Sequence, residues 1–232
     1  MLVQLNQIKK TYISEQVATD ALKGINMNIQ ERDFLAIMGP SGCGKSTLLN
    51  IIGLLDIPTE GEVLFKGQKM SKLSERQRAD FRKKHIGFIF QNFNLIDDLS
   101  VYENIELPLM YLSYPSKERK QIVINLMQEL KIAHRASYYP RQLSGGQQQR
   151  VAICRALAVQ PDLLLADEPT GNLDSQNSEE VMQILWRLNQ QGTTIVMVTH
   201  SLQDAEYARH TVKLLDGQVV GRQQNQFLRM QN

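Results

Sequence analysis

Residues 34–55 read FLAIMGPSGCGKSTLLNIIGLL, and this stretch decides the fold. A short apolar run, residues 34–38, precedes the glycine-rich segment GPSGCGKST, and an apolar helical run follows it. The middle segment fits the phosphate-binding pattern GxxxxGK[ST] in the strand-to-helix context that the pattern requires. Its glycines let backbone N–H groups turn towards phosphates, and the helix start adds the positive end of its dipole. The stretch therefore predicts a nucleotide-binding α/β core.

Two side chains of this loop carry specific chemistry. Lys45 is expected to reach the β- and γ-phosphates of ATP, and Ser46 to offer its hydroxyl to Mg²⁺. The whole loop is expected to bind the nucleotide, and its members are Gly39, Pro40, Ser41, Gly42, Cys43, Gly44, Lys45, Ser46 and Thr47. Cys43 is expected to behave as a small buried hydrophobe, although a thiol at a helix N-terminus can also be reactive. The alternative, a glycine-rich turn that caps a structural helix, is disfavoured by the flanking strand and helix.

Similar apolar runs recur along the chain. Residues 86–90, 163–166 and 194–199 are nearly continuous apolar runs, so we expect central parallel strands buried on both faces. The alternation in residues 2–8 and 21–29 instead predicts half-buried antiparallel strands beside this core.

The sequence between these runs is mostly helical in its periodicity. Helices are expected at 101–112, 117–130 and 146–157, in a subdomain of about residues 95–157 inserted into the core. A further helix at 175–190 places its apolar residues on one stripe. The expected fold class is therefore α/β: a phosphate-loop NTPase core with a mainly parallel central sheet, an N-terminal antiparallel β subdomain and an inserted helical subdomain.

The composition limits the partners and the compartment. The formal net charge is +2, from 26 basic and 24 acidic residues, so there is no strong positive field for nucleic acid. Cys43 and Cys154 lack the CxxC spacing of a zinc or redox site, which fits a reducing cytoplasm. We find no signal-peptide pattern, and the apolar runs are shorter than the roughly 18–20 residues that span a bilayer. Any membrane contact is therefore expected through a partner.

Polar side chains follow three of the expected parallel strands. The run LLLADE at 163–168 ends in two carboxylates, at the sheet edge where open α/β folds bind ligands. Asp167 is expected to hold Mg²⁺, and Glu168 to act as general base towards water. Gln91 and His200 follow two other strands. Each of these has an ordinary alternative when taken singly: a solvated strand end, a surface amide or a loop histidine.

Residues 143–147, LSGGQ, predict a second anion site. A serine hydroxyl, two flexible backbone amides and a helix N-terminus come together there. The pentapeptide arises by chance in about one chain in several thousand. The inserted helical subdomain separates it from the phosphate loop, so the two anion sites need not serve one nucleotide within one chain. A head-to-tail dimer lets each loop use the other copy's LSGGQ segment.

Over about residues 1–221, these motifs in this order resemble the nucleotide-binding subunit of ATP-binding cassette (ABC) transporters. The resemblance implies ATP and Mg²⁺, adenine stacking by Tyr12, and Gln91 as a Mg²⁺ ligand that senses a membrane partner. It implies Glu168 as the base and His200 as a switch residue at the γ-phosphate. It also implies an ATP-dependent homodimer with Asp174 at its seam. The signature residues that contact the partner's γ-phosphate are Ser144, Gly145, Gly146 and Gln147. Residues 222–232 are expected to be a frayed tail.

Three longer segments narrow the resemblance. Residues 21–67, residues 85–109 (HIGFIFQNFNLIDDLSVYENIELPL) and residues 166–175 (ADEPTGNLDS) are similar to the macrolide-export and lipoprotein-release subfamily. This subfamily also includes peptide exporters and the cell-division cassette. The similarity implies an integral membrane permease as partner, received near residues 91–95 and 101–112, and a peripheral place on the cytoplasmic face of the bacterial inner membrane. Phe93 and Leu95 have the alternative of packing under the helical subdomain.

Other classes of protein share part of this pattern. One alternative is a non-transport ABC ATPase that acts in cell-division signalling, DNA repair or on ribosomes. Repair cassettes carry long heptad coiled coils and translation factors carry two cassettes, and the sequence has neither. A nucleotide kinase has no reason to combine LSGGQ with the Asp-Glu pair and the late histidine. A subunit that binds ATP without hydrolysis is disfavoured because Lys45, Glu168 and His200 are present. The sequence does not name a cargo.

Overall fold

A six-stranded sheet with the order β10-β9-β3-β8-β7-β6 forms the centre of the part that the computed structural model describes, residues 1–14 and 17–225. Strands β9, β3, β8, β7 and β6 are parallel to their neighbours, and β10 (Gln218–Gln224) runs antiparallel at the edge. The parallel strands are β3 (Phe34–Met38), β6 (Ile86–Phe90), β7 (Leu163–Asp167), β8 (Thr194–Thr199) and β9 (His210–Leu215). The expected mainly parallel core is confirmed.

The central strands are buried on both faces, which explains their continuous apolar runs. In β3, Ala36 and Met38 belong to one buried cluster while Leu35 and Ile37 belong to another. Successive side chains of a strand point to opposite faces, so each central strand must be apolar at every position.

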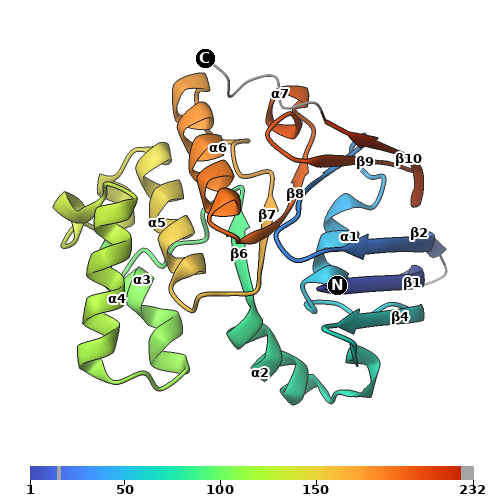
Figure 1. Ribbon diagram of the computed structural model, residues 1–232, viewed down its shortest axis with the longest axis horizontal. Coiled ribbons are helices and arrows are strands. Elements are labelled where there is room, and N and C mark those ends of the chain that lie inside the picture. Colours follow the sequence, from blue (N-terminus) through green and yellow to red (C-terminus); the bar gives the residue numbers. More distant parts are fainter. Residues whose placement is uncertain (15–16, 226–232) are drawn as a thin grey trace.

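The first cluster lies between the sheet and the helices on its left in Figure 1. Helices α5 (Gly145–Leu157) and α6 (Ser175–Gln190) contribute to it, and α3 (Val101–Tyr111) and α4 (Ser116–Glu129) lie beyond α5 (Figure 1). The second cluster lies on the opposite face and contains residues of α1 (Lys45–Ile52) and of the antiparallel sheet. None of the described helices is long and apolar enough to cross a membrane.

The expected N-terminal antiparallel sheet is confirmed, with the order β2-β1-β4-β5. Its strands are β1 (Val3–Ser14), β2 (Val17–Ile29), β4 (Glu60–Phe65) and β5 (Gln68–Lys69). Strands β1 and β2 are longer than their alternating segments indicate. Register shifts interrupt their pairing at three places, including between Leu5 and Ile8. Each shift breaks the simple alternation on which the sequence prediction depends.

Serine and aspartate side chains fix where several of the helices begin, whereas α4 begins after Pro115 without a side-chain cap. Capping boxes join Ser100 to Glu103 at α3 and Ser144 to Gln147 at α5, and Asp174 caps α6. A third box joins Ser74 to Gln77 at α2 (Glu75–His85), a helix that the sequence analysis missed although Ser-x-x-Gln is a helix-start signal. The short segments are the helix α7 (Leu202–Ala205) and the 3-10 turns Met70–Lys72, Ala133–Arg135 and Pro140–Gln142.

The C-terminal boundary of the fold differs from the prediction. Strands β9 and β10 were not anticipated, and β10 continues through Gln224, so residues 222–225 are not a frayed tail. Arg222 pairs with Val212, and Asn225 donates to the carbonyls of Ala205 and Ala208 at 2.8 Å. The polar composition of residues 222–225 does not reveal that they pair in a hairpin with β9. Residues 226–232 lie outside the described residues.

Two glycines of the antiparallel sheet provide a matched test of this packing. Gly61 and Gly67 both have positive φ, +92° and +78°, but a Cβ at Gly61 would lie 2.4 Å from the Gln7 carbonyl oxygen, whereas Gly67 has no neighbour within 4 Å. We expect Gly67→Ala to lower the free energy of unfolding by about 1 kcal/mol, the cost of the left-handed backbone. Gly61→Ala should lower it by about 3 kcal/mol or more, since a backbone clash is added. Urea unfolding measures both, and equal losses would contradict the close contact.

Candidate active site

Four parallel strands deliver the predicted site residues to one edge of the sheet. In their register Met38 lies beside Thr199, Asp167 beside Val198 and Phe90 beside Asp167. The residues that follow are the phosphate loop after β3, His200 after β8, Glu168 after β7 and Gln91 after β6. Because the carboxyl ends of parallel strands meet at the same edge, segments far apart in sequence form one polar surface.

The phosphate loop has a shape that only glycine permits at two positions. Gly44 has φ +101°, and a Cβ there would lie 2.5 Å from the Ala21 carbonyl oxygen. A Cβ at Gly39 would lie 2.2 Å from the Leu214 carbonyl oxygen. The loop therefore packs closely between strand β2 and strand β9. Its backbone can turn inward only because Gly39 and Gly44 carry no Cβ atom.

Lys45 and the start of α1 supply the positive charge of the loop. Lys45 is 8% exposed, and its Nζ donates to the Gly39 and Pro40 carbonyls at 2.8 and 2.9 Å. No side chain caps α1, so its first backbone N–H groups remain available to an anion. Cys43 is only 4% exposed. A reagent therefore reaches its thiol only if the loop opens.

Tyr12 lies beside the phosphate loop, on strand β1. Its hydroxyl donates to Asp56 Oδ2 at 2.8 Å and is within hydrogen-bonding reach of the Thr47 side chain. Lys10 Nζ lies 4.9 Å from the ring centroid, and the residue remains 43% exposed. One ring face thus contacts a cation, and an exposed aromatic ring next to a phosphate loop suits stacking by a base.

The side chains expected to hold Mg²⁺ offer hard oxygen donors. Burial raises the pKa of Asp167 above its ordinary value, and the charge of Glu168 raises it further, while the Ser46 hydroxyl and Lys45 oppose the shift. Two adjacent carboxylates at a partly buried site favour a cation, and Mg²⁺ prefers oxygen ligands. The described residues contain no cluster of three His, Cys, Asp or Glu side chains suited to a metal. The donor set therefore fits a cation shared with a phosphate ligand, as in other phosphate-loop sites.

Glu168 is held in a strained conformation. Its φ is +46°, and its backbone N–H donates to the Val198 carbonyl at 2.9 Å. His200 Nδ1 lies 3.2 Å from Glu168 Oε2. Non-glycine residues with left-handed φ cost free energy and persist where the surroundings fix them, often at functional sites. Glu168 and His200 thus form a pair at the edge of the sheet, beside Asp167.

The signature residues lie at the start of α5, away from the phosphate loop. Ser144 Oγ accepts from the Gln147 N–H at 3.4 Å, and Gln147 Oε1 accepts from the Ser144 N–H at 3.1 Å. A Cβ at Gly146 would lie 2.0 Å from Asn177 Oδ1, and Asn177 in turn bonds to Asp174. The starts of α5 and α6 therefore touch, and this contact requires glycine.

The phosphate loop and the signature do not meet within this chain. Strands β8 and β7 separate β3 from β6. At about 4.8 Å per strand, β3 and β6 are about 14 Å apart. Helix α5 lies beyond β6, on the opposite side of the sheet from α1 (Figure 1).

Three further side chains fix the position of the loop after Glu168, and none of them has a role expected from the sequence. Gln149 is fully buried and its Nε2 donates to the Pro169 carbonyl at 2.6 Å, while its Oε1 has no partner among the described residues. Thr170 Oγ1 bonds to Asp204 Oδ2 at 2.5 Å, joining the loop to α7. Asn172 bonds to the backbone of Gln91. Asn172 stands in the quoted run GNLD, and the others have no sequence signal beyond their neighbourhood.

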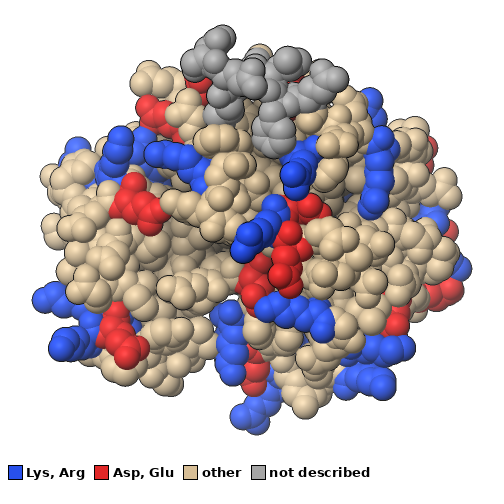
Figure 2. Space-filling view, viewed as in Figure 1, with Lys and Arg blue, Asp and Glu red and all other residues tan. Residues whose placement is uncertain are grey.

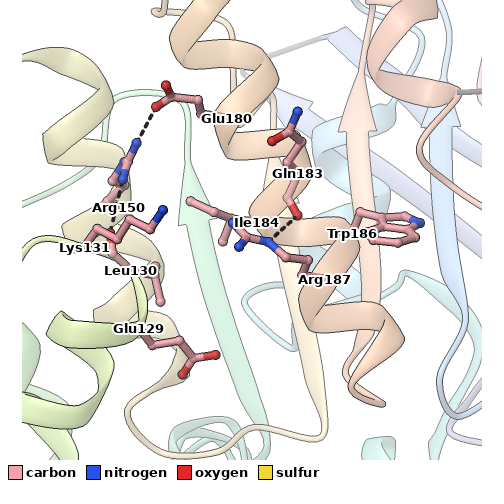
Figure 3. Close-up of a pocket in the computed structure, with 9 residues that line it drawn as sticks. All are labelled: Glu129, Leu130, Lys131, Arg150, Glu180, Gln183, Ile184, Trp186 and Arg187. Atoms are coloured by element: carbon pink, nitrogen blue, oxygen red, sulfur yellow. Dashed lines mark hydrogen bonds and ion pairs between the residues drawn. The ribbon is translucent and has the colours of Figure 1, made fainter. Parts of the chain in front are cut away.

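Arg150, three residues after the signature, joins helices rather than facing the site. It pairs with Glu180 of α6 and donates to the Leu130 carbonyl at 3.3 Å. Figure 3 shows both contacts at a cavity of about 400 Å³ between the end of α4, α5 and α6. The cavity lining, drawn in full in the figure, contains no predicted site residue.

Comparisons with known proteins agree with this geometry. The family described as "ABC transporter" matches residues 22–171. An uncharacterized ABC transporter ATP-binding protein of Methanocaldococcus jannaschii is 51% identical over 219 residues, which cover 94% of this chain and 98% of that protein. The macrolide export ATP-binding/permease protein MacB of Brucella melitensis is 44% identical over 94% of this chain, but the match covers 34% of that longer protein.

One solved structure is similar over nearly the whole chain. It is a dimeric ATP-binding cassette from Methanocaldococcus jannaschii in a post-hydrolysis state, bound to ADP and Pi. It has a TM-score of 0.89 and 44% sequence identity, and the match covers 97% of this chain and 99% of that one.

Gln149 gives a direct test of how the loop after Glu168 is held. Gln149→Leu loses the bond to the Pro169 carbonyl but also removes a buried oxygen that has no partner, so we expect the free energy of unfolding to change by no more than about 1 kcal/mol. Gln149→Ala leaves a cavity and should lose about 2–4 kcal/mol. Urea unfolding compares the two variants. A loss in Gln149→Leu as large as in Gln149→Ala would mean that the hydrogen bond dominates.

Proposed function

Because this chain belongs to the ABC transporter family and is an ATPase subunit of a transporter, we propose that two copies of it close on ATP and drive an integral membrane permease of the macrolide, lipoprotein or peptide export type. On this proposal the chain works at the cytoplasmic face of the bacterial inner membrane, where the permease holds it. Cargo selection then belongs to the permease or to another partner.

The observation that carries the dimer proposal is the separation of the two anion sites in one chain. The phosphate loop precedes α1 and the signature precedes α5, with two strands between β3 and β6. A head-to-tail pair brings the signature of one copy over the phosphate loop of the other. Each ATP then contacts both copies, so binding of ATP favours the closed dimer and loss of the γ-phosphate contacts reopens it.

The surface beside Glu168 and His200 suits such a seam. A cavity of about 390 Å³ opens there, and its lining includes Gly171 and Leu173. Leu202, two residues after His200, is 72% exposed. An exposed apolar side chain next to an open polar cavity is typical of a surface that a partner covers.

Hydrolysis then uses groups that the sheet edge already holds together. Glu168 takes a proton from water as the water oxygen bonds to the γ-phosphorus and the bond to the β–γ bridging oxygen breaks, releasing ADP. Lys45 and the N–H groups of the loop stabilise the charge on the γ-phosphate. His200, 3.2 Å from Glu168, orients that carboxylate and reaches towards the γ-phosphate.

Ser46, Gln91 and Asp167 would hold Mg²⁺ beside the phosphates. The metal supplies a positive charge that neutralises the β- and γ-phosphate oxygens. Ser46 and Asp167 already interact in this chain, so their oxygens converge without the ion.

A groove lined by residues of α3, β6 and α5 supports docking of a permease helix. It has a volume of about 330 Å³, and its apolar lining includes Leu55, Phe88, Pro108 and Tyr111. Tyr111 is 70% exposed and Leu55 is 46% exposed. Apolar grooves of this kind receive amphipathic helices.

The groove differs in part from the docking residues that the resemblance implies. Its lining takes the C-terminal half of α3 but none of residues 91–95, and Leu95 packs against the core. Arg155 lines the groove and donates to the carbonyls of Phe93 and Asn94, so this side chain connects the loop after Gln91 to the groove.

Figure 2 shows Lys, Arg, Asp and Glu interspersed over the visible face, in line with the small net charge.

The Glu168→Gln variant tests the role of the base. We expect ATP-driven dimerisation to persist while the rate of phosphate release falls by about 10²–10⁴-fold, since the amide cannot take the proton. Light scattering measures the dimer with and without ATP, and phosphate release measures turnover. Glu118→Gln, an exposed change on α4, is the matched control and should behave as the parent. Hydrolysis by Glu168→Gln at the parental rate would show that Glu168 is not the base.

The permease proposal is tested by capture from detergent-solubilised membranes with the Glu168→Gln variant and ATP. We expect a permease with few membrane helices and a large extracytoplasmic domain to co-purify. Tyr111→Asp should abolish the capture because a charge in the groove opposes an apolar helix. Val220→Asp, at a 58% exposed side chain on β10 at the opposite edge of the sheet from β6, should leave it unchanged. Capture of ribosomes or DNA instead would contradict the transporter partner while leaving the ATPase intact.

A further inference from the structure

Gln91 and Asn172 are linked although they are 81 residues apart. Gln91 follows strand β6, and Asn172 lies in the loop that begins at Glu168. Asn172 Nδ2 donates to the Gln91 backbone carbonyl at 3.1 Å and to Asn92 Oδ1 at 2.8 Å. In return, Gln91 Nε2 donates to Asn172 Oδ1 at 3.3 Å.

This network fixes which way both amides point. A backbone carbonyl can only accept, so the end of Asn172 that faces the Gln91 carbonyl must be its NH₂ group. Asn172 Oδ1 is then the end that meets the Gln91 side chain, and it can only accept. Gln91 must therefore present its NH₂ group to Asn172. Its Oε1 is left free, and no hydrogen bond occupies it among the described residues.

Close packing on Gly171 supports this orientation. A Cβ at Gly171 would lie 2.7 Å from Gln91 Nε2, so the amide lies directly against the backbone of the loop. The loop after Gln91 is itself constrained, since Phe93 and Asn94 both have positive φ, +60° and +49°. The Arg155 guanidinium donates to both of their carbonyls. The backbone that carries the Gln91 side chain is thus held by Asn172 and, just after it, by Arg155.

We propose that Asn172 is a positioning residue that orients the Gln91 amide so that its oxygen faces the metal. The inference rests on the proposed function, in which Gln91 is a Mg²⁺ ligand. A divalent hard cation binds the amide oxygen and not the NH₂ group, so a flipped Gln91 contributes no ligand. Asn172 belongs to the loop that also carries Glu168, so the metal ligand and the base are set by one segment. Residues that orient ligands in this way typically change metal affinity about tenfold or more when replaced.

The test uses Mn²⁺ in place of Mg²⁺, with ATP and the full-length Glu168→Gln protein, in which hydrolysis is expected to be slow during the measurement. Electron paramagnetic resonance measures the Mn²⁺ affinity of the ATP complex. We expect Asn172→Ala and Gln91→Ala each to weaken Mn²⁺ binding about tenfold. The double variant should be no weaker than Gln91→Ala, because Asn172 acts only through Gln91. Glu118→Gln, the exposed change on α4, should keep the parental affinity.

The possible outcomes separate the two ideas. If Gln91→Ala weakens Mn²⁺ binding and Asn172→Ala does not, the positioning role is overturned and the metal role of Gln91 stands. Additive losses in the double variant would also overturn it, since Asn172 would then act independently. If Gln91→Ala has no effect, Gln91 is not a ligand and both ideas fail. ATP affinity without metal is expected to be parental in every variant, and if Asn172→Ala loses it, Asn172→Ser takes its place in the same comparison.

Discussion

Parallel hydrogen bonding between β3, β8, β7 and β6 is the constraint on which the rest of the molecule depends. It fixes the register that places Met38 beside Thr199 and, one position earlier on β8, Val198 beside Asp167, which in turn lies beside Phe90. Parallel strands need crossover connections, and those connections are the helices that bury both faces of the sheet. The polar residues directly after the strands therefore all lie at the edge where the carboxyl ends of the strands meet. A slip of one residue in any strand would move a site residue to the wrong face.

The loop from Glu168 to Asp174 is where the parts of the ATPase are joined. Gln149 holds this loop from α5, Asp204 holds it from α7 and Gln91 holds it from the end of β6. Asp174, at the end of the loop, caps α6. The first residue of the loop is strained. Such a segment has few accessible conformations, so we expect a change at any of these contacts to alter the conformation of Glu168. One short stretch of backbone therefore connects helix α5, helix α7 and the end of β6 to Glu168, the proposed base.

Much of the site could be predicted because its chemistry is local in sequence. The phosphate loop needs glycines at fixed spacing, and the Asp-Glu pair needs only a strand before it. The contacts of Gln149 and Asn172 could not be predicted, since each joins residues brought together by folding. The 4% exposure of Cys43 agrees with the expectation of a small buried hydrophobe. Its place at a helix start does not show that the fold closes over the thiol. Strand β9 pairs with β3, which is far away in the chain. Strands β9 and β10 instead form a local hairpin across Asp216 and Gly217, and this Asp-Gly turn signal was overlooked.

The sequence by itself determined the class of fold, the order of its strands along the chain and the residue types at the phosphate loop, the signature and the acidic pair. These follow from the periodicity of apolar residues and from short motifs, which are properties of neighbouring residues. Only the tertiary structure decided the order of the strands in the sheet, the distance that keeps the signature of one chain from its own phosphate loop, and the orientation of the Gln91 amide. Those depend on hydrogen bonds and packing between segments distant in sequence, and such contacts exist only once the chain has folded.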